Sequence, residues 1–574
     1  MRKLFLLILL YASLSISFGQ EYTDLEASLD NFIVKKREKF GVTGLSVALL
    51  IDNEVVLSNG YGFANKENQV LADENTIYAI GSISKLLTST SILKLYDEGK
   101  IDIDRPYTDY VPEFTMKQHF EGVQPFTVRH LLAHFAGLPR LNAKGFLTKE
   151  EKPLSRILEI SKASYLISRP GIVNQYSDWG TELLAVLVEK VSKQSFQEYV
   201  RDNVFSPLKM TGSSYERITS TQSYQNGKPI PTYEYSYPGA DGVIATAKDI
   251  ANLGQMYLNK GQFNHGTYLS MAISTDALTP QFLNAPLNFG KNNGLMWDVN
   301  QFSQYTRISK GGIHEPFYSM LYIIPEFNMT LAICSNSNSN AVIHRAIYGK
   351  VVDYLKKVKT GEPTNISSPK LKPVTLSDDE MKRLTGLYST DEGIVKIEQK
   401  GQRLRVYFDK LDKTLVAKPY SNNILRLKAK LLGIIPIHVM DVFMEEVNGE
   451  IVVGERYASG RRSLGGVKIE KKAIPASWQD ALGRYRISQI DESEYQNLHE
   501  VELKINKFGI LEISGQVLYP NKFSLRLPLS PVSNKLAIVP GYSFDFFAGE
   551  TIQIVNNDGK KDLIMSGYTF TKVN

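Results

Sequence analysis

Two residues three positions apart could carry nucleophilic chemistry in this chain: Ser82 and Lys85, in the segment Ser-Ile-Ser-Lys. An apolar stretch over 76–80 precedes them, Gly81 can turn the chain, and a helical pattern follows to about Glu98. Residues three apart on a helix share one face, so the lysine amine would lie within reach of the serine hydroxyl. A serine hydroxyl is a weak nucleophile and needs a base of this kind. The alternative is a serine that caps the helix and a solvated lysine.

Two later segments distinguish this pattern from its other copies. Tyr176 and Asp178 precede a strong helical pattern over 179–191, and Lys310 starts a Lys-Gly-Gly run at the end of a predicted strand over 304–309. The other copies of the Ser-x-x-Lys pattern do not stand in such a series of motifs. They lie at 91–94, 206–209 and 367–370. The order is serine and lysine, then tyrosine with a polar residue two positions on, then a lysine–glycine strand end.

With these motifs in this order, the chain resembles the serine β-lactamase and penicillin-binding protein superfamily. More narrowly, it is similar to the class C β-lactamase-related peptidases and esterases of peptidase family S12. That family has Tyr-x-Asn as its second motif and Lys-Thr-Gly or His-Xaa-Gly as its third. The segments 128–139 and 241–250 match as well, and the resemblance covers roughly 25–357. It implies an antiparallel sheet flanked by helices, with the active site between the sheet part and an all-helical part.

The resemblance implies an acyl-enzyme on Ser82, with the proton shared between Lys85 and Tyr176. From the residues alone the base stays open. Lys85 can serve if burial or neighbouring charge lowers its pKa, and Tyr176 can serve if cations stabilise a tyrosinate. Lys310 could supply such a cation or hold a substrate carboxylate. An ordinary half-buried tyrosine is the alternative for Tyr176, because the chain has 31 tyrosines.

Acyl transfer also needs donors for the oxyanion. The backbone N–H groups of Ser82 and Ile313 could supply two. Gly311 and Gly312 would let a substrate backbone lie against the strand edge. These residues complete the predicted substrate-binding set, together with Asp178 and Lys310.

Four positions depart from the family pattern. Asp178 stands where asparagine is usual, and an ionised carboxylate cannot donate a hydrogen bond to a substrate carbonyl. It could instead pair with Lys85 or hold a substrate ammonium, which puts β-lactam turnover in doubt. Gly311 stands where threonine is common. His314 and Glu315 follow where small residues are frequent, so we expect a narrower cleft.

Composition indicates a soluble globular protein rather than a nucleic-acid-binding protein. The 574 residues are 43% hydrophobic and 22% charged, and 66 basic against 60 acidic residues give a net charge of +6. That charge is too mild and too dispersed for nucleic acid. Cys334 is the single cysteine and lies in an apolar strand, so we expect it in the core. The eight histidines show no metal-ligand spacing and no nucleotide-binding glycine loop appears, so neither a metal nor another cofactor is expected.

The first 19 residues predict export. Arg2 and Lys3 precede an apolar run over 4–18, and small residues lead to a cleavage position after Gly19. An uncleaved membrane anchor is the alternative, although the run is short for a span. No later segment is apolar enough to cross a bilayer, so we expect a periplasmic or secreted protein without a stable membrane span.

The fold class we expect is α/β (α+β), followed by one or two all-β barrel-like domains. Strands are predicted at 45–51, 54–60, 294–299, 304–309, 317–324 and 329–335, and helices at 23–40 and 341–357. The predicted boundaries are a catalytic domain over 20–357, a linker over 358–376, and barrels over 377–472 and 473–574. The linker is rich in Pro, Ser, Thr and Lys.

The two barrels are predicted from a diverged repeat. Gly386-Leu387-Tyr388 is echoed by Gly483-Arg484-Tyr485, and each follows a short helical turn, at 378–383 and 476–480. Alternating apolar residues follow both, as antiparallel barrels require. We expect the barrels to fold separately; they could bind a ligand, cap the cleft or assemble a homo-oligomer.

Together these observations predict an exported serine hydrolase that acts on D-amino-acid peptides, small esters or amides. The narrower alternative is a β-lactamase. The non-enzymatic alternative is a penicillin- or peptide-binding protein that acylates without turnover.

Overall fold

The computed structural model describes residues 22–573, except 141–143, 146, 233–236, 303, 338–340, 361–370, 391–392, 402, 432–434, 458–459, 489–490, 495–497, 518–522, 543–547 and 558–559. The predicted export signal over 1–19 and most of the predicted linker lie outside these residues. The chain forms two compact units. The first comprises 1–101, 188–280 and 293–365, and the second comprises 102–187, 281–292 and 366–574.

The first unit is built on a seven-stranded antiparallel sheet in the order β10-β11-β12-β13-β1-β2-β3. Its strands are β1 (Gly44–Ile51), β2 (Glu54–Asn65), β3 (Val70–Leu71), β10 (Asp298–Gln301), β11 (Thr306–His314), β12 (Phe317–Ile324) and β13 (Met329–Ser335). The strands from the two ends of the unit meet where β1 pairs with β13, with Leu45 opposite Ser335. The predicted antiparallel sheet is confirmed.

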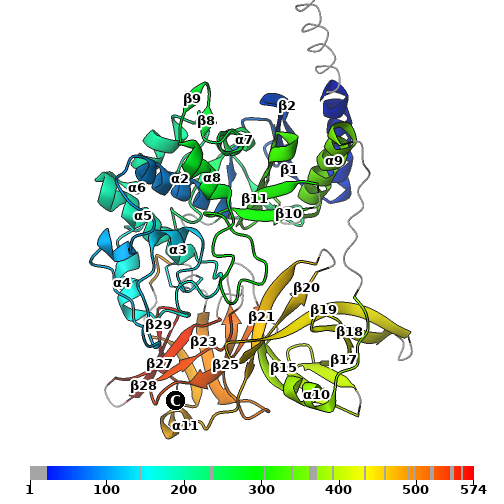
Figure 1. The fold of residues 1–574 in the computed structure, drawn as a ribbon. Helices are drawn as coiled ribbons and strands as arrows, with labels where there is room; N and C mark the ends of the chain where they lie inside the picture. The colour runs from blue at the N-terminus through cyan, green and yellow to red at the C-terminus, as the bar shows by residue number, and fades with distance from the viewer. Residues whose placement is uncertain are drawn as a thin grey trace, which may run out of the picture. The chain divides into compact units, whose positions relative to one another are not determined.

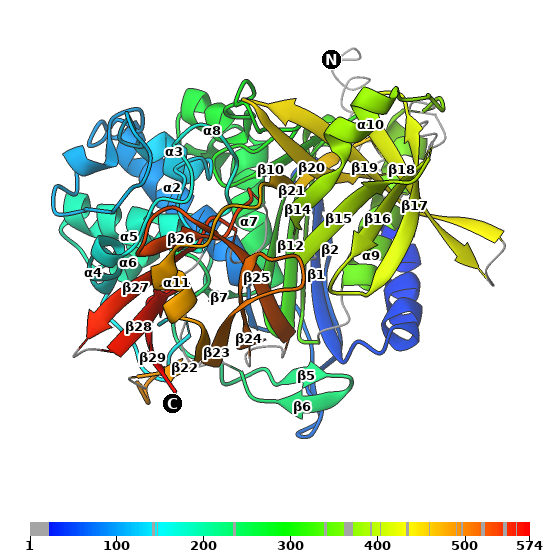
Figure 2. The ribbon, with the colours of Figure 1, turned by 90° about the horizontal axis from the view of Figure 1, so that it is seen from below.

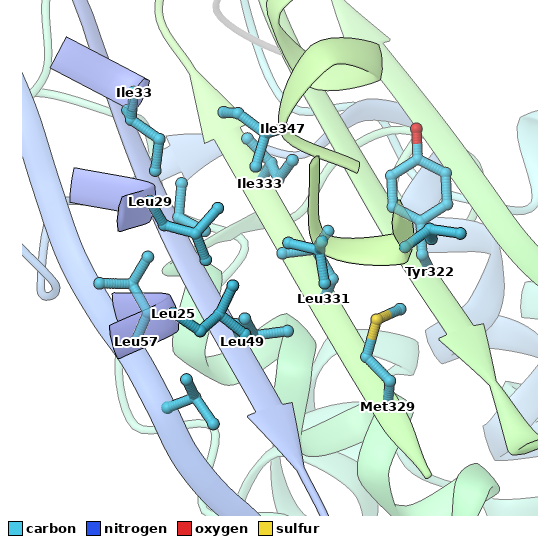
Figure 3. Packing of buried hydrophobic residues seen from close by; sticks show 14 of the residues in the cluster. Leu25, Leu29, Ile33, Leu49, Leu57, Tyr322, Met329, Leu331, Ile333 and Ile347 are labelled. Carbon is cyan, nitrogen blue, oxygen red and sulfur yellow. The ribbon is translucent and has the colours of Figure 1, made fainter. Parts of the chain in front are cut away.

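Helices cover both faces of this sheet. The helix over 22–39 and α9 (Ala341–Lys359) share one face, as Figure 1 shows. The helix over 22–39 packs its side chains Leu25, Leu29 and Ile33 against Ile347 and against the side chains of β1, β2, β12 and β13 on this face (Figure 3). On the other face lies α7 (Ala247–Leu258), where a Cβ on Gly254 would meet Thr330 Cγ2 at 2.7 Å. Because both faces of β1 are covered, its sequence is largely apolar and does not alternate between apolar and polar residues.

Apart from the 14-residue helix α2 (Ser84–Asp97), the remaining elements of the first unit are short. They are β4 (Tyr78–Ala79), η1 (Gly81–Ile83), α2 (Ser84–Asp97), α6 (Phe196–Val200), η3 (Arg201–Phe205), β5 (Ser223–Gln225), β6 (Lys228–Ile230), β7 (Ile244–Ala245), β8 (Gln262–Phe263), β9 (Gly266–Thr267), α8 (Met271–Leu278) and η4 (Pro325–Phe327). Cys334 is buried in β13, as its apolar strand indicated, and burial raises the pKa of its thiol to about 12. A thiol in that state is not a nucleophile.

The second unit begins with short helices and ends with two closed eight-stranded barrels. The helical elements before its barrels are η2 (Tyr107–Asp109), α3 (Val128–Leu132), α4 (Arg156–Ala163) and the start of α5 (Asp178–Ser192). The first barrel consists of β14 (Gly386–Thr390), β15 (Gly393–Gln399), β16 (Leu404–Phe408), β17 (Lys413–Tyr420), β18 (Ile424–Leu431), β19 (Ile435–Val447), β20 (Glu450–Arg456) and β21 (Arg462–Ile469). The second consists of β22 (Gly483–Ile487), β23 (Leu498–Ile505), β24 (Leu511–Val517), β25 (Phe523–Pro531), β26 (Leu536–Ile538), β27 (Thr551–Asn557), β28 (Lys560–Met565) and β29 (Tyr568–Lys572).

The repeat predicted from the sequence is visible in the barrels, whose strands can be followed in Figure 2. A short helix precedes each, α10 (Asp378–Leu384) and α11 (Ala476–Asp480). Tyr388 donates its hydroxyl to the Leu384 carbonyl at 2.7 Å, and Tyr485 donates to the Ala481 carbonyl in the same way. A lysine of each closing strand also donates to its helix: Lys468 to the Arg383 carbonyl and Lys572 to the Asp480 carbonyl.

Among the described residues, no helix has both the length and the apolar character that crossing a bilayer requires.

The first barrel packs directly on the segment that leads to Tyr176. Val173 is buried in one apolar cluster with Leu287 and with side chains of the barrel strands β20 and β21, namely Val452, Leu464 and Val467. Beside this cluster, the Arg462 guanidinium lies 4.0 Å from the Phe443 ring centroid and 5.0 Å from that of Phe289. The outer wall of the barrel is therefore part of the support of this segment.

We predict that Leu464→Ala loosens the segment over 171–176 in the full-length protein. Loss of a buried leucine side chain typically lowers the free energy of unfolding by about 2–5 kcal/mol, and here the cavity would open beside Val173. Hydrogen exchange measured by mass spectrometry should show faster exchange in peptides that contain this segment.

The matched control is Leu525→Ala, a leucine of similar burial inside the second barrel. It should accelerate exchange in that barrel and leave 171–176 unchanged. An equal response of 171–176 to both substitutions would contradict local support by β21.

Candidate active site

Ser82 and Lys85 lie together at the start of α2. Ser82 belongs to the 3-10 turn η1, and the α-helix itself begins at Ser84, two residues later than the sequence pattern predicted. The Lys85 ammonium Nζ donates to Ser82 Oγ at 3.0 Å and to the Ala240 carbonyl at 2.8 Å. The Lys85 side chain is fully buried. The N-cap positions are Ile80 and Ile83, without side-chain capping bonds, so Ser82 is not a helix cap.

The loop over 239–245 holds the lysine in place. Thr88 Oγ1 donates to the Gly239 carbonyl at 2.6 Å, and the Val243 N–H donates to Ser84 Oγ at 3.2 Å. The strands β4 and β7 then pair just before the turn Gly81–Ile83, which carries the candidate nucleophile Ser82 and is called the nucleophile turn below. These two hydrogen bonds between the loop and α2 lie on either side of Ala240, whose carbonyl accepts the hydrogen bond from Lys85 Nζ.

The Lys310-Gly311-Gly312 run lies within a strand and not at its end. The predicted strand over 304–309 was too short, because β11 continues to His314. Both glycines stay in register with β12, Gly311 opposite Met320 and Gly312 opposite Ser319. The Lys310 side chain is only 4% exposed. Glycine has a weak strand preference, which is why sequence reasoning ended the strand early.

The nucleophile turn and β11 approach each other closely at two glycines. Gly81 has a φ of +54°, and a Cβ there would lie 2.5 Å from the Ile313 backbone nitrogen. A Cβ on Gly312 would lie 1.8 Å from the Ile80 carbonyl oxygen and 3.0 Å from the Ser82 nitrogen. The two predicted oxyanion donors, the N–H groups of Ser82 and Ile313, therefore belong to backbone segments in direct contact.

Tyr176 and Asp178 lie in the second unit, in a segment organised by His134 and Arg140. His134 packs its ring on Tyr176 with centroids 4.6 Å apart, and its Nδ1 accepts from the Ser177 N–H at 3.3 Å. The Arg140 guanidinium lies 5.6 Å from the Tyr176 ring centroid. These contacts give His134 a structural role. Arg140 was missed, because an arginine after a Gly-Leu-Pro turn carries no signal of its own.

Asp178 is the first residue of α5 and is 7% exposed. Its N–H donates to the Arg140 carbonyl at 2.7 Å. A carboxylate at a helix N-terminus is stabilised by the unpaired N–H groups and the helix dipole. This gives Asp178 a structural contribution beside any contact with a substrate.

His314, which the sequence predicts to narrow the cleft, has its side chain buried against Asp241. The Ala240 carbonyl was also missed, because a backbone acceptor leaves no mark in a sequence. Within the described ranges, no three His, Cys, Asp or Glu side chains are grouped closely enough to hold a metal ion.

We predict that Gly312→Ala slows acylation of Ser82 by at least about a hundredfold. The new methyl group would meet the Ile80 carbonyl, and separating β11 from the turn displaces the oxyanion donors; a displacement of ~1 Å can have this effect. The measurement is the rate of labelling by a fluorophosphonate.

Gly349→Ala in α9 is the control, because nothing lies within 4 Å of a Cβ there and the residue is no part of the proposed site. This variant should label within about threefold of the wild-type rate. Equal rates for both variants would show that the close contact at Gly312 does not set the reaction geometry.

Comparison with known proteins identifies the family of the chain. Residues 29–355 match the family model described as Beta-lactamase. Protein flp of Staphylococcus aureus (strain N315) is 26% identical over 330 residues, which are 56% of this chain and 64% of that protein. The chain thus spans less than two thirds of the length of this relative.

Two solved structures share the fold. The crystal structure of SurE with D-Leu superimposes with a TM-score of 0.57 at 17% identity, covering 79% of this chain and 100% of that one. The octameric penicillin-binding protein homologue from Pyrococcus abyssi gives 0.50 at 20% identity, covering 77% and 99%. The family match, over more than half of the residues, shows that the chain belongs to the beta-lactamase family of serine hydrolases.

Proposed function

We propose that this protein is an exported serine hydrolase that forms an acyl-enzyme on Ser82. The observation that carries the proposal is the fully buried Lys85 amine 3.0 Å from the Ser82 hydroxyl. A buried amine that touches a serine hydroxyl is the arrangement that nucleophilic catalysis requires. An S12-like peptidase or esterase is the class that we favour.

In the proposed reaction, Ser82 Oγ attacks the substrate carbonyl carbon and its proton passes to the Lys85–Tyr176 pair. The oxyanion is stabilised by the N–H groups of Ser82 and Ile313. Collapse of the tetrahedral intermediate breaks the ester or amide bond, and the pair returns the proton to the leaving group. Water then attacks the acyl-enzyme by the same route in reverse, which frees the acid and restores the Ser82 hydroxyl.

Peptides or amides with a free D-amino acid are the substrate class that we favour. A structure of similar fold was solved with D-Leu. Asp178 provides a carboxylate where an asparagine amide would otherwise contact a substrate carbonyl, and a carboxylate suits an ammonium group. Small esters should also react, because they need only the nucleophile and the oxyanion donors.

Turnover of β-lactams, or acylation without turnover, is the second candidate function. The Pyrococcus abyssi structure is of a penicillin-binding protein homologue, and it is octameric, which also favours a homo-oligomer here. The proposed location, periplasmic or secreted, rests on the predicted signal over 1–19.

Intact-mass spectrometry should show one covalent adduct on Ser82 after incubation with a fluorophosphonate, and none in Ser82→Ala. In steady-state assays, D-aminoacyl p-nitroanilides and p-nitrophenyl esters should be hydrolysed faster than nitrocefin. Labelling that persists in Ser82→Ala would refute the assignment of the nucleophile. A stable adduct without turnover on any of these compounds would favour the penicillin-binding alternative.

Lys85 and Tyr176 should behave as one proton-handling pair. Lys85→Ala and Tyr176→Phe should each lower kcat/KM by at least about a thousandfold, because each interrupts the same proton transfer. The double variant should be little worse than the worse single variant. Losses that multiply fully would mean that the two residues act in separate steps. Tyr224→Phe, at another buried tyrosine, is the control and should retain activity.

A further inference from the structure

The first unit contains a buried histidine–aspartate pair that the proposed reaction does not use. His314 Nδ1 lies 2.8 Å from Asp241 Oδ2, and the two side chains are 8% and 9% exposed. The other carboxylate oxygen, Oδ1, is buried and has no hydrogen-bond partner among the described residues. Because a buried carboxylate needs a partner, the bond to His314 should strongly constrain the conformation of both segments.

The histidine lies on the face of β11 that meets the nucleophile turn. Successive side chains of a strand point to opposite faces, so Lys310, Gly312 and His314 share one face. A Cβ on Gly312 would lie 3.0 Å from the Ser82 nitrogen, which identifies that face. His314 is thus the next residue beyond the close contact, and Ile313, with its N–H, lies between them.

The aspartate lies on the loop that holds Lys85. Asp241 directly follows Ala240, whose carbonyl accepts from Lys85 Nζ at 2.8 Å. The Asp241 N–H donates to the Tyr237 carbonyl at 2.8 Å, which fixes the start of the turn. Thr88, which donates to the Gly239 carbonyl, and Ser84, which accepts from the Val243 N–H, tie this loop to α2. The bond between His314 and Asp241 ties it to β11.

We infer that Asp241 and His314 are positioning residues for acyl transfer. Their bond fixes the loop over 239–243 against the end of β11. The Ala240 carbonyl then keeps the Lys85 amine on Ser82 Oγ while the Ile313 N–H keeps its place beside Gly81. Neither side chain exchanges a proton with the substrate. The inference rests on the proposed acylation of Ser82. It assigns to the His314–Asp241 bond the role of joining the loop that holds Lys85 to the strand that carries the Ile313 N–H.

The central test compares His314→Ala with His314→Asn, measured as the second-order rate of Ser82 labelling by a fluorophosphonate. The asparagine amide nitrogen occupies about the place of Nδ1 and can still donate to Asp241, but it cannot carry a proton as an imidazole does. We expect His314→Ala to slow labelling by about tenfold or more and His314→Asn to stay within about threefold of wild type. With a p-nitrophenyl ester, the loss should appear in kcat with little change in KM.

A double-variant cycle tests the pairing. Asp241→Ala should slow labelling as His314→Ala does, and the double variant should be no slower than the worse single variant. His344→Ala is the matched control: His344 is also a buried histidine of the first unit, bonded to Ser335 Oγ at 2.9 Å but located in α9. It should lower the melting temperature and leave the labelling rate of the folded protein within about twofold.

Hydrogen exchange provides a readout that needs no activity. His314→Ala should increase exchange in peptides covering both 310–317 and 237–245, and His344→Ala in neither. If exchange rises only around 314, the His314–Asp241 bond does not hold the loop over 239–243 against β11, and the inference is overturned. Labelling of the His314→Ala variant at the wild-type rate would overturn it as well. Labelling of His314→Asn as slow as that of His314→Ala would overturn the positioning assignment and make His314 a proton carrier. If the wild-type protein is never labelled on Ser82, the proposed function is refuted. The exchange data alone would then show whether the His314–Asp241 bond links the loop to β11.

Discussion

Burial of the Lys85 ammonium is the constraint on which the rest of the site depends. An unpaired charge in a protein interior is strongly unfavourable, so the group needs close acceptors. The structure supplies the Ser82 hydroxyl at 3.0 Å and the Ala240 carbonyl at 2.8 Å. The first acceptor is the proposed nucleophile, and the second is a backbone atom, whose position depends on the surrounding loop. The need to stabilise one cation therefore links the start of α2 to a loop about 155 residues further along the chain.

The second constraint is the close approach of two backbones. The turn at Gly81 and the strand at Gly312 are so near that a side chain on Gly312 would overlap the Ile80 carbonyl. Such an approach places backbone N–H groups from distant parts of the sequence side by side, which is how an oxyanion site is built without charged side chains. It also explains why Gly311 and Gly312 are not equivalent. The first faces a flexible methionine, and the second faces rigid backbone.

The local hydrophobic pattern and the turn residues were sufficient to predict two strands of the sheet and the two barrels. The strands at 317–324 and 329–335 have the predicted bounds, because apolar β-rich runs end there at turn residues. The barrels followed from the repeated Gly-x-Tyr and its alternating strands. The sequence could not predict that β11 continues through Gly311 and Gly312. These glycines are kept in the strand by pairing with β12 and not by their own strand preference. The bond between His314 and Asp241 was also out of reach, because it joins residues 73 positions apart and neither fits a periodic pattern.

The two units use different physical means to hold their proposed site residues. In the first, hydrogen bonds from α2 and β11 fix a loop around a buried charge. In the second, the segment before Tyr176 is held by ring contacts from His134 and by apolar packing of Val173 on the wall of the first barrel. A barrel that supplies none of the proposed reacting groups can thus still influence the proposed reaction, because loosening its wall would loosen the approach to Tyr176. The sequence suggested a ligand-binding, capping or assembly role for the barrels. Packing on Val173 adds mechanical support of the tyrosine segment, a role that does not require the barrel interior to bind anything.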